Sequence, residues 1–268
     1  MKIISKSSLD EVNKSAAHFY LKYLSGIKQE YIQTDEMLIG EAFHKLLLEP
    51  LQFDSNFAVY DDTQDLKDIG GSKPKSTNWY KGKLEEIKQI NFGKKIILQN
   101  DFDLIQEMRD VFMQNANARY MIDSGFAEKK RFFTEPNTGL PCQYLTDFHN
   151  TNLDIFVDIK TTKDASSSEF AKSCANYRYH VQDSFYSDGY FNETGDKIKG
   201  FYFIAIEKTK PYNLAIYCLN EESKDLGREE YLRNMNTIKN CYQSGIWQGY
   251  TEKIQQISLP RYYFNKFQ

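Results

Sequence analysis

One apolar stretch of the sequence ends on charged and hydroxyl side chains, and this is its clearest sign of chemistry. Leu153, Ile155 and Val157 alternate with Asp154, Phe156 and Asp158. This period of two predicts a strand with one buried face. On such a strand Asp158 and Lys160 point to the same side. The carboxylate can bind a divalent metal while the ammonium holds a water or a phosphate oxygen beside it. A solvated strand end with a simple ion pair would show the same pattern, so other motifs must decide.

A second aspartate precedes this strand. Short strands are predicted over residues 128–134, 140–148 and 153–160, with a turn at 136–139. Three consecutive short strands form an antiparallel meander. Asp147 lies near the end of the middle strand, so both aspartates can meet at one end of the sheet, at the separation that one or two Mg²⁺ ions require. Taken alone, Asp147 could equally be a turn residue.

A helix predicted over residues 34–49 carries the next candidate. Thr34 can cap this helix and Pro50 stops it, and Gly40 and His44 lie one turn apart within it. Glycine costs about 1 kcal/mol inside a helix. Gly40 therefore suggests that another backbone approaches the face that carries His44, although a core glycine beside a satisfied histidine would look the same.

The remaining elements must complete the sheet and its cover. Ser8 and Glu11 form a capping box that opens a helix reaching Gly26. Gln182 and Tyr186 share one face of a helix over 178–191. Residues 70–77 lack the G-K-[ST] triplet of a phosphate loop, so we expect a flexible basic loop. Further helices are predicted over 78–90, 101–122, 166–175 and 221–244, and further strands over 199–207 and 212–219.

Composition limits the classes of protein that this chain can belong to. Its 268 residues fit one domain, with a core over about 34–245, a helical insertion over about 61–124 and a C-terminal tail over 246–268. Residues 257–268 of the tail are apolar and aromatic enough to dock on the body or on a neighbouring subunit. The net charge of -3 means that any nucleic acid must bind in a local basic groove. No signal peptide or membrane span is recognisable, so we expect a cytoplasmic protein.

Several other chemistries lack their motifs. The four cysteines are far apart without any C-x-x-C pair, which argues against a zinc ribbon or an iron-sulfur cluster. No G-x-S-x-G and no H-E-x-x-H occurs, and the four histidines do not cluster.

Five motifs together resemble the RecB-like branch of the PD-(D/E)XK nucleases in order and spacing. They are Gly40-x-x-x-His44, Glu128, the segment from Gly139 to Asp147, Asp158-x-Lys160 and Gln182-x-x-x-Tyr186. Residues 40–50, 158–162 and 179–186 look like the RecE-type exonucleases of the exodeoxyribonuclease VIII group, and the resemblance covers roughly 34–207. One departure is that Leu145-Thr146 stands where the family usually has Arg-Pro, which removes a phosphate-facing arginine.

The resemblance implies an α/β fold, a mixed central sheet flanked by helices as in restriction endonucleases. It implies four metal ligands, which are His44, Asp147, Asp158 and the carbonyl of Ile159. It implies catalytic positions at Asp147, Asp158, Lys160 and Glu128, with Lys160 positioning or activating the attacking water and Glu128 an acidic position near the site. It implies contacts to DNA from Gln182, Tyr186 and Thr161.

The function expected from this resemblance is a Mg²⁺-dependent, ATP-independent exonuclease on double-stranded DNA ends. Mn²⁺ can substitute, because the imidazole of His44 suits it slightly better. The resemblance implies 5′ to 3′ polarity, 3′ single strands for recombination, a single-strand annealing partner, a ring of identical subunits, and a bacterial or phage-infected cell.

A catalytically weak DNA-binding or assembly subunit with the same fold is the alternative, which the missing Arg-Pro favours slightly. Retention of Asp147, Asp158 and Lys160 argues against it, since a dead site has no physical need for three costly polar groups at one sheet end.

Overall fold

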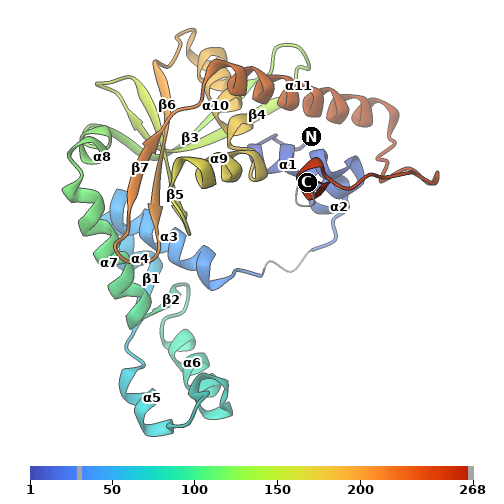
Figure 1. The fold of residues 1–268 in the computed structure, drawn as a ribbon. Helices are drawn as coiled ribbons and strands as arrows, with labels where there is room; N and C mark the ends of the chain where they lie inside the picture. Colours follow the sequence, from blue (N-terminus) through green and yellow to red (C-terminus); the bar gives the residue numbers. More distant parts are fainter. Residues whose placement is uncertain (29–31, 265–268) are drawn as a thin grey trace.

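Five strands form the central sheet of the protein (Figure 1). The computed structural model describes residues 1–28 and 32–264. Across the sheet lie, in this order, β3 (Gly125–Thr134), β4 (Pro141–Asn150), β5 (Ile155–Thr162), β6 (Gly200–Glu207) and β7 (Leu214–Tyr217). β5 and β6 run parallel, and all other neighbours run antiparallel. The predicted meander of three strands is therefore confirmed, as is the mixed α/β sheet.

The parallel pair at the centre requires a crossover, which α9 (Ser167–Asn176) and α10 (Tyr179–Thr194) provide. α10 packs on one face of the sheet together with α1 (Lys6–Lys14), α2 (Ala16–Tyr23) and α11 (Glu221–Ser244). The core on this face contains Phe156, Val181, Phe185 and Phe203.

The opposite face of the sheet is covered by α3 (Asp35–Leu48), α7 (Gln99–Gln114) and α8 (Ala116–Met121). Phe43 and Phe112 pack there against Val157 and Ile159. β5 is therefore buried on both faces, so the single buried face predicted from the period of two was wrong. Burial on both faces explains why its sequence is almost continuously apolar up to Asp158.

Two of the predicted helices are each broken into two, for the same physical reason. The first helix does not run from Ser8 to Gly26, because Ser15 ends α1 and its hydroxyl accepts a hydrogen bond from the backbone of His18 to begin α2. The capping box is formed by Ser5 and Ser8, with Ser5 as the N-cap. Ser8 is therefore the third residue of helix α1 and not its N-cap. Asn115 breaks the helix predicted over 101–122 in the same way, since it caps α8. Short polar side chains inside a helical pattern thus act as caps.

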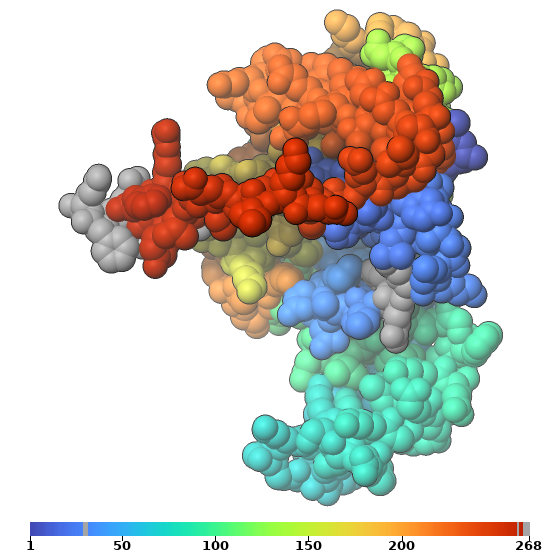
Figure 2. Space-filling model, turned by 90° about the vertical axis from the view of Figure 1, so that its right-hand side faces the viewer, coloured from blue at the N-terminus to red at the C-terminus, as the bar shows by residue number. Residues whose placement is uncertain are grey.

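Of the predicted insertion, α7 and α8 pack on the sheet. A lobe over residues 57–98 projects beyond the sheet instead (Figures 1 and 2). The lobe consists of β1 (Phe57–Tyr60), α5 (Thr63–Ile69), the 3₁₀ turn η2 (Pro74–Ser76), α6 (Asn78–Ile90) and β2 (Lys95–Leu98), and β1 pairs parallel with β2. The segment predicted as a loop ends in η2, where Lys75 forms an ion pair of 3.2 Å with buried Asp62. Asp62 also accepts a hydrogen bond from Tyr80 at 2.6 Å.

Short elements link α3 to the lobe and end the described chain. They are η1 (Pro50–Gln52), α4 (Phe53–Asn56) and α12 (Arg261–Phe264). The tail from residue 251 to 261 is exposed and extends from the body in Figure 2, so the predicted docking on the body is not seen there. Docking on a neighbouring subunit stays a prediction, and Phe267 lies outside the described residues. Within the described ranges, no helix is both long and apolar enough to cross a membrane.

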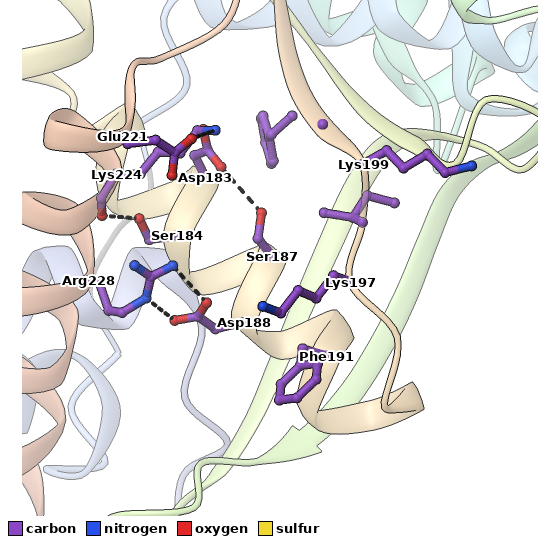
Figure 3. Close-up of a pocket in the computed structure, with 13 residues that line it drawn as sticks. Asp183, Ser184, Ser187, Asp188, Phe191, Lys197, Lys199, Glu221, Lys224 and Arg228 are labelled. Atoms are coloured by element: carbon purple, nitrogen blue, oxygen red, sulfur yellow. Dashed lines mark hydrogen bonds and ion pairs between the residues drawn. The ribbon is translucent and has the colours of Figure 1, made fainter.

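A hollow of about 560 Å³ separates α10 from the segment that enters β6, and a buried aspartate lines it (Figure 3). Asp183 is 1% exposed, and one of its oxygens accepts a hydrogen bond from Ser187 at 3.2 Å. Its other oxygen has no hydrogen-bond partner among the described residues. Burial raises the pKa of Asp183 to about 7, although the nearby charge of Lys224 opposes this rise.

We predict that Asp183 makes the protein less stable as the pH rises. The folded chain binds the Asp183 proton more tightly than the unfolded chain, whose aspartate pKa is about 3.9, so stability is lost as the pH rises through the folded pKa. Between pH 5 and 8, in addition to the fall from the other raised carboxyl groups, the contribution of Asp183 to the free energy of unfolding should fall by about 2 to 3 kcal/mol. Asp183→Asn should remove most of this fall. Urea unfolding at both pH values measures it, with the exposed Asp196→Asn as control. An unchanged pH dependence in Asp183→Asn would contradict the assignment.

Candidate active site

The hydrogen-bonded ladder between β4 and β5 stops where the predicted site begins. Their paired residues run from Asn150 and Ile155 to Phe148 and Val157. Beyond them, the backbone N–H of Ile159 donates to the carboxylate of Asp147 at 2.7 Å, in place of a strand carbonyl. The carbonyl of a strand residue faces the same side as its N–H. The Ile159 carbonyl, predicted as a metal ligand, therefore faces the edge that carries Asp147.

Glu128 reaches this edge from β3 through an unusual backbone conformation. Its neighbours Ala127 and Lys129 pair with Phe148 and Thr146, which puts Glu128 opposite Asp147. Its φ is 48°, a left-handed conformation that costs a residue other than glycine about 1 to 3 kcal/mol. Such strain persists only where the surrounding structure imposes it, and it is concentrated at functional sites.

His44 approaches the same edge from α3. Thr34 caps this helix as predicted, accepting a hydrogen bond from the backbone of Met37 at 3.3 Å. The Nδ1 atom of His44 lies 3.5 Å from the carboxylate of Asp147. A Cβ on Gly40 would lie 3.3 Å from the hydroxyl of Thr161, so the group that approaches Gly40 is a side chain and not the predicted backbone.

His44, Glu128 and Asp147 form a cluster that can hold a metal ion, with one ligand atom from each within 4.8 Å of the others. Two carboxylates and an imidazole, with the Ile159 carbonyl beside them, fit Mg²⁺ or Mn²⁺. Burial, together with the negative charges of Asp147 and Glu49, raises the pKa of Glu128 to about 7. A cation would offset this repulsion, so the donor set fits a divalent metal.

Asp158 lies behind this cluster. It is 2% exposed, and its two oxygens contact the ammonium of Lys160 and the amide of Gln182. Burial and the charge of Asp147 raise the pKa of Asp158. The role of Asp158 as a metal ligand stays a prediction, because both oxygens face Lys160 and Gln182 and the three-residue cluster does not include it.

Lys160 presents a fixed positive charge at the same place. Burial alone would lower the pKa of Lys160, but the charges of Asp158 and Asp147 outweigh it and hold the pKa above its usual value. The ammonium also lies 4.7 Å from the ring centre of Tyr179, a cation–π contact. Tyr179 was not singled out by sequence, although it precedes Gln182 by three residues and so shares its helix face.

An open cleft of about 760 Å³ gives access to these groups. The predicted site residues that line it are His44, Glu128, Ile159, Lys160 and Thr161. Lys208 and Tyr179 also line it and were missed. The signal for Lys208 is its place just after β6, because ligands bind beyond the carboxyl ends of parallel strands and β5 ends at the same edge.

Gln182 and Tyr186 lie inside the protein. Gln182 donates to Asp158, and Tyr186 packs against Tyr144 and Phe201 with ring centres 5.5 and 6.2 Å away. Their contact with the DNA backbone stays a prediction. What the structure shows is that Gln182 orients Asp158 and that Tyr186 belongs to the core.

The chain matches the model of the family described as PDDEXK-like domain of unknown function (DUF3799) over residues 5–260. A solved structure from Eubacterium rectale, described as a candidate exonuclease, shares the fold with a TM-score of 0.59 at 12% identity, covering 98% of this chain and 92% of that one. A phage-related exonuclease from Haemophilus somnus 129PT gives a TM-score of 0.35 at 11% identity, covering 66% of this chain and 91% of its own. No curated protein matches the chain. The match to the PDDEXK-like family model confirms the predicted PD-(D/E)XK core.

We predict that Asp147→Asn weakens divalent metal binding without unfolding the protein. The asparagine oxygen can still accept the hydrogen bond from Ile159, so the strand edge is kept while the charge is lost. Calorimetry should show at least a tenfold lower Mn²⁺ affinity. Glu229→Gln, on the exposed side of α11, is the matched control. A folded Asp147→Asn variant with the parent affinity would show that the cation binds elsewhere.

Proposed function

We propose a nuclease activity for this chain, which belongs to the PDDEXK-like family whose model it matches over residues 5–260. The single observation that carries the proposal is the cluster of His44, Glu128 and Asp147, two of whose members, His44 and Glu128, line one open cleft together with Lys160. Carboxylates that can hold a metal ion, with a lysine ammonium beside them, are the groups that phosphodiester hydrolysis requires. The specific activity we propose is exonucleolytic cleavage of double-stranded DNA ends.

The residues of the cleft divide the chemical work between them. His44, Glu128, Asp147 and the Ile159 carbonyl would hold a divalent cation, which we propose to be Mg²⁺ with Mn²⁺ as a substitute. When bound, the cation would lower the pKa of a water and compensate charge on the phosphate. Lys160, kept charged by Asp158, would hold a water or a phosphate oxygen beside the cluster. Gln182 and Tyr179 fix the positions of Asp158 and Lys160.

The finer assignment follows from the resemblance to the RecE-type exonucleases. We propose 5′ to 3′ polarity, with 3′ single strands as the product for recombination by annealing. We also propose an annealing protein and further copies of this chain as partners, and the exposed tail gives such copies an apolar segment to contact. ATP independence is supported by the missing phosphate-loop triplet in residues 70–77.

One observation favours a catalytically weak DNA-binding or assembly subunit as the second candidate. Leu145 and Thr146 precede Asp147 where related nucleases usually have Arg-Pro, and the Thr146 hydroxyl is buried without a hydrogen bond among the described residues. No arginine therefore reaches the phosphate from this position. The pair of Asp158 and Lys160 supports the nuclease instead, because Asp158 is nearly inaccessible and burying its charge costs several kcal/mol that a passive subunit need not spend.

Digestion of a linear duplex tests the proposed activity directly. The duplex carries a label at one 5′ end or at one 3′ end, and it is incubated with and without Mg²⁺. We expect metal-dependent release of mononucleotides from the 5′ label first. Metal-independent binding without any cleavage would support the second candidate. Earlier release from the 3′ label would show that the enzyme degrades DNA from 3′ to 5′.

Lys160→Met tests the role of the ammonium in the reaction. Because transition-state charge loses its partner, the single-turnover rate should fall about 10²- to 10³-fold. Affinity for duplex ends at saturating Mg²⁺ should change only a few-fold, since the cluster stays intact. Lys199→Met, at the opposite end of β6, is the matched control.

A loss of stability in Lys160→Met must be separated from a loss of chemistry. Removing one partner of a buried pair typically costs about 3 to 5 kcal/mol of stability. The double variant Asp158→Asn, Lys160→Met removes both charges and serves as the folded comparison, with melting temperature measured for each. A folded variant that cuts within a few-fold of the parent rate would disprove the catalytic role of Lys160.

A further inference from the structure

We propose that the basic lobe, defined as residues 70–95, is a second DNA-binding surface that grips the substrate outside the cleft. The inference rests on the proposed function, because it takes the partner to be DNA. It is carried by the charge of the lobe, by its unpaired lysines, by its exposed aromatic side chains and by its junction with the cleft.

Positive charge is concentrated in the basic lobe. Its 26 residues contain seven lysines and two glutamates, a net charge of +5. With the acids of residues 57–69 the whole lobe over 57–98 carries +2, whereas the chain carries -3 and the rest of it therefore carries -5. A polyanion such as DNA is attracted to such a local patch even when the protein as a whole is acidic.

Three of these lysines remain available for a partner. Ion pairs inside the protein use four of the seven, namely Lys75, Lys83, Lys88 and Lys95. Lys73, Lys81 and Lys94 are exposed and have no ion pair with any described residue. Free ammonium groups on a surface of this sign fit phosphate oxygens.

Aromatic side chains accompany the free lysines. Trp79 is 54% exposed at the start of α6, and Phe92 is 94% exposed just after its end. Neither ring packs on another aromatic side chain among the described residues. Exposed rings among lysines are the combination by which proteins hold bases and backbone of unpaired DNA.

The basic lobe joins the wall of the cleft at one end. Lys95 forms an ion pair with Glu41, which lines the cleft one turn before His44 on α3. α6 begins at the far end of the lobe and runs back toward β2, as Figure 1 shows, so its last residues lie nearest the sheet. The 13 residues of α6 span about 20 Å, the rise of about six nucleotides. DNA that leaves the cleft on this side meets Lys94, then Phe92, and reaches Trp79 at the far end.

The test compares DNA binding of the parent with that of a triple variant, Lys73→Gln, Lys81→Gln, Lys94→Gln, without divalent metal so that cleavage does not interfere. The probes are a 30-base-pair blunt duplex and the same duplex with a 10-nucleotide single-strand extension. Affinity at 0.1 M salt should fall about 10- to 100-fold, and the slope of log K against log salt should shrink by about 2 to 3, since each lost phosphate contact contributes about 0.7 to 0.9. A triple variant of the exposed Lys197, Lys199 and Lys253 is the matched control.

Fluorescence of Trp79 adds a readout that a merely structural role would not move. In a Trp247→Phe background Trp79 is the only tryptophan, and its emission should be quenched on adding DNA. A lobe variant that keeps the parent affinity and salt slope, in a protein that binds DNA, would overturn the inference while leaving the proposed function intact. A parent protein that binds neither probe without metal would overturn the inference, and the metal-dependent digestion of the duplex decides the proposed function separately.

Discussion

The hydrogen bond from the Ile159 backbone to the Asp147 carboxylate is the constraint on which the site depends. A strand in the middle of a sheet normally gives its N–H groups to a neighbouring strand, and a buried N–H without a partner is costly. Here a side chain is the acceptor, so β4 and β5 can separate without leaving an orphan donor. The separation leaves the Ile159 carbonyl facing the same edge and makes room for His44 and Glu128 beside Asp147.

The second constraint is the buried charge at the end of β5. Asp158 is nearly inaccessible, and its ionised form would be expensive without the Lys160 ammonium and the Gln182 amide. These partners come from β5 itself and from α10, so the crossover helix does more than cover the sheet. It fixes the carboxylate that in turn keeps Lys160 charged and oriented at the cleft. The packing of α10 against the sheet and α11 is therefore part of the active site, although few of its residues are exposed.

Local patterns predicted the position of β5, the meander and the cap at Thr34, because apolar runs, turns and caps are properties of neighbouring residues. Alternation misled about the faces of β5, since both are buried. They failed at Ser15 and Asn115, where a cap inside a helical pattern looks like an ordinary polar residue. The left-handed conformation of Glu128 and the burial of Gln182 could not be predicted either. Both are imposed by strands and helices distant in sequence, and a shared helix face does not tell whether that face meets solvent or the sheet.

The distribution of charge separates two tasks in binding a polyanion. The acidic cluster of the cleft repels phosphate, and the basic lobe cannot offset this repulsion along its whole length, because α6 alone is about 20 Å long and the Debye length at 0.1 M salt is about 10 Å. In the proposed nuclease, compensation at the scissile phosphate would therefore be local, from a cation held by the cluster and from Lys160. The free lysines of the lobe act on phosphates several nucleotides away, where their contribution is to affinity and to its salt dependence. Chemistry and grip are thus assigned to different elements, and the ion pair of Lys95 with Glu41 is the point where they meet.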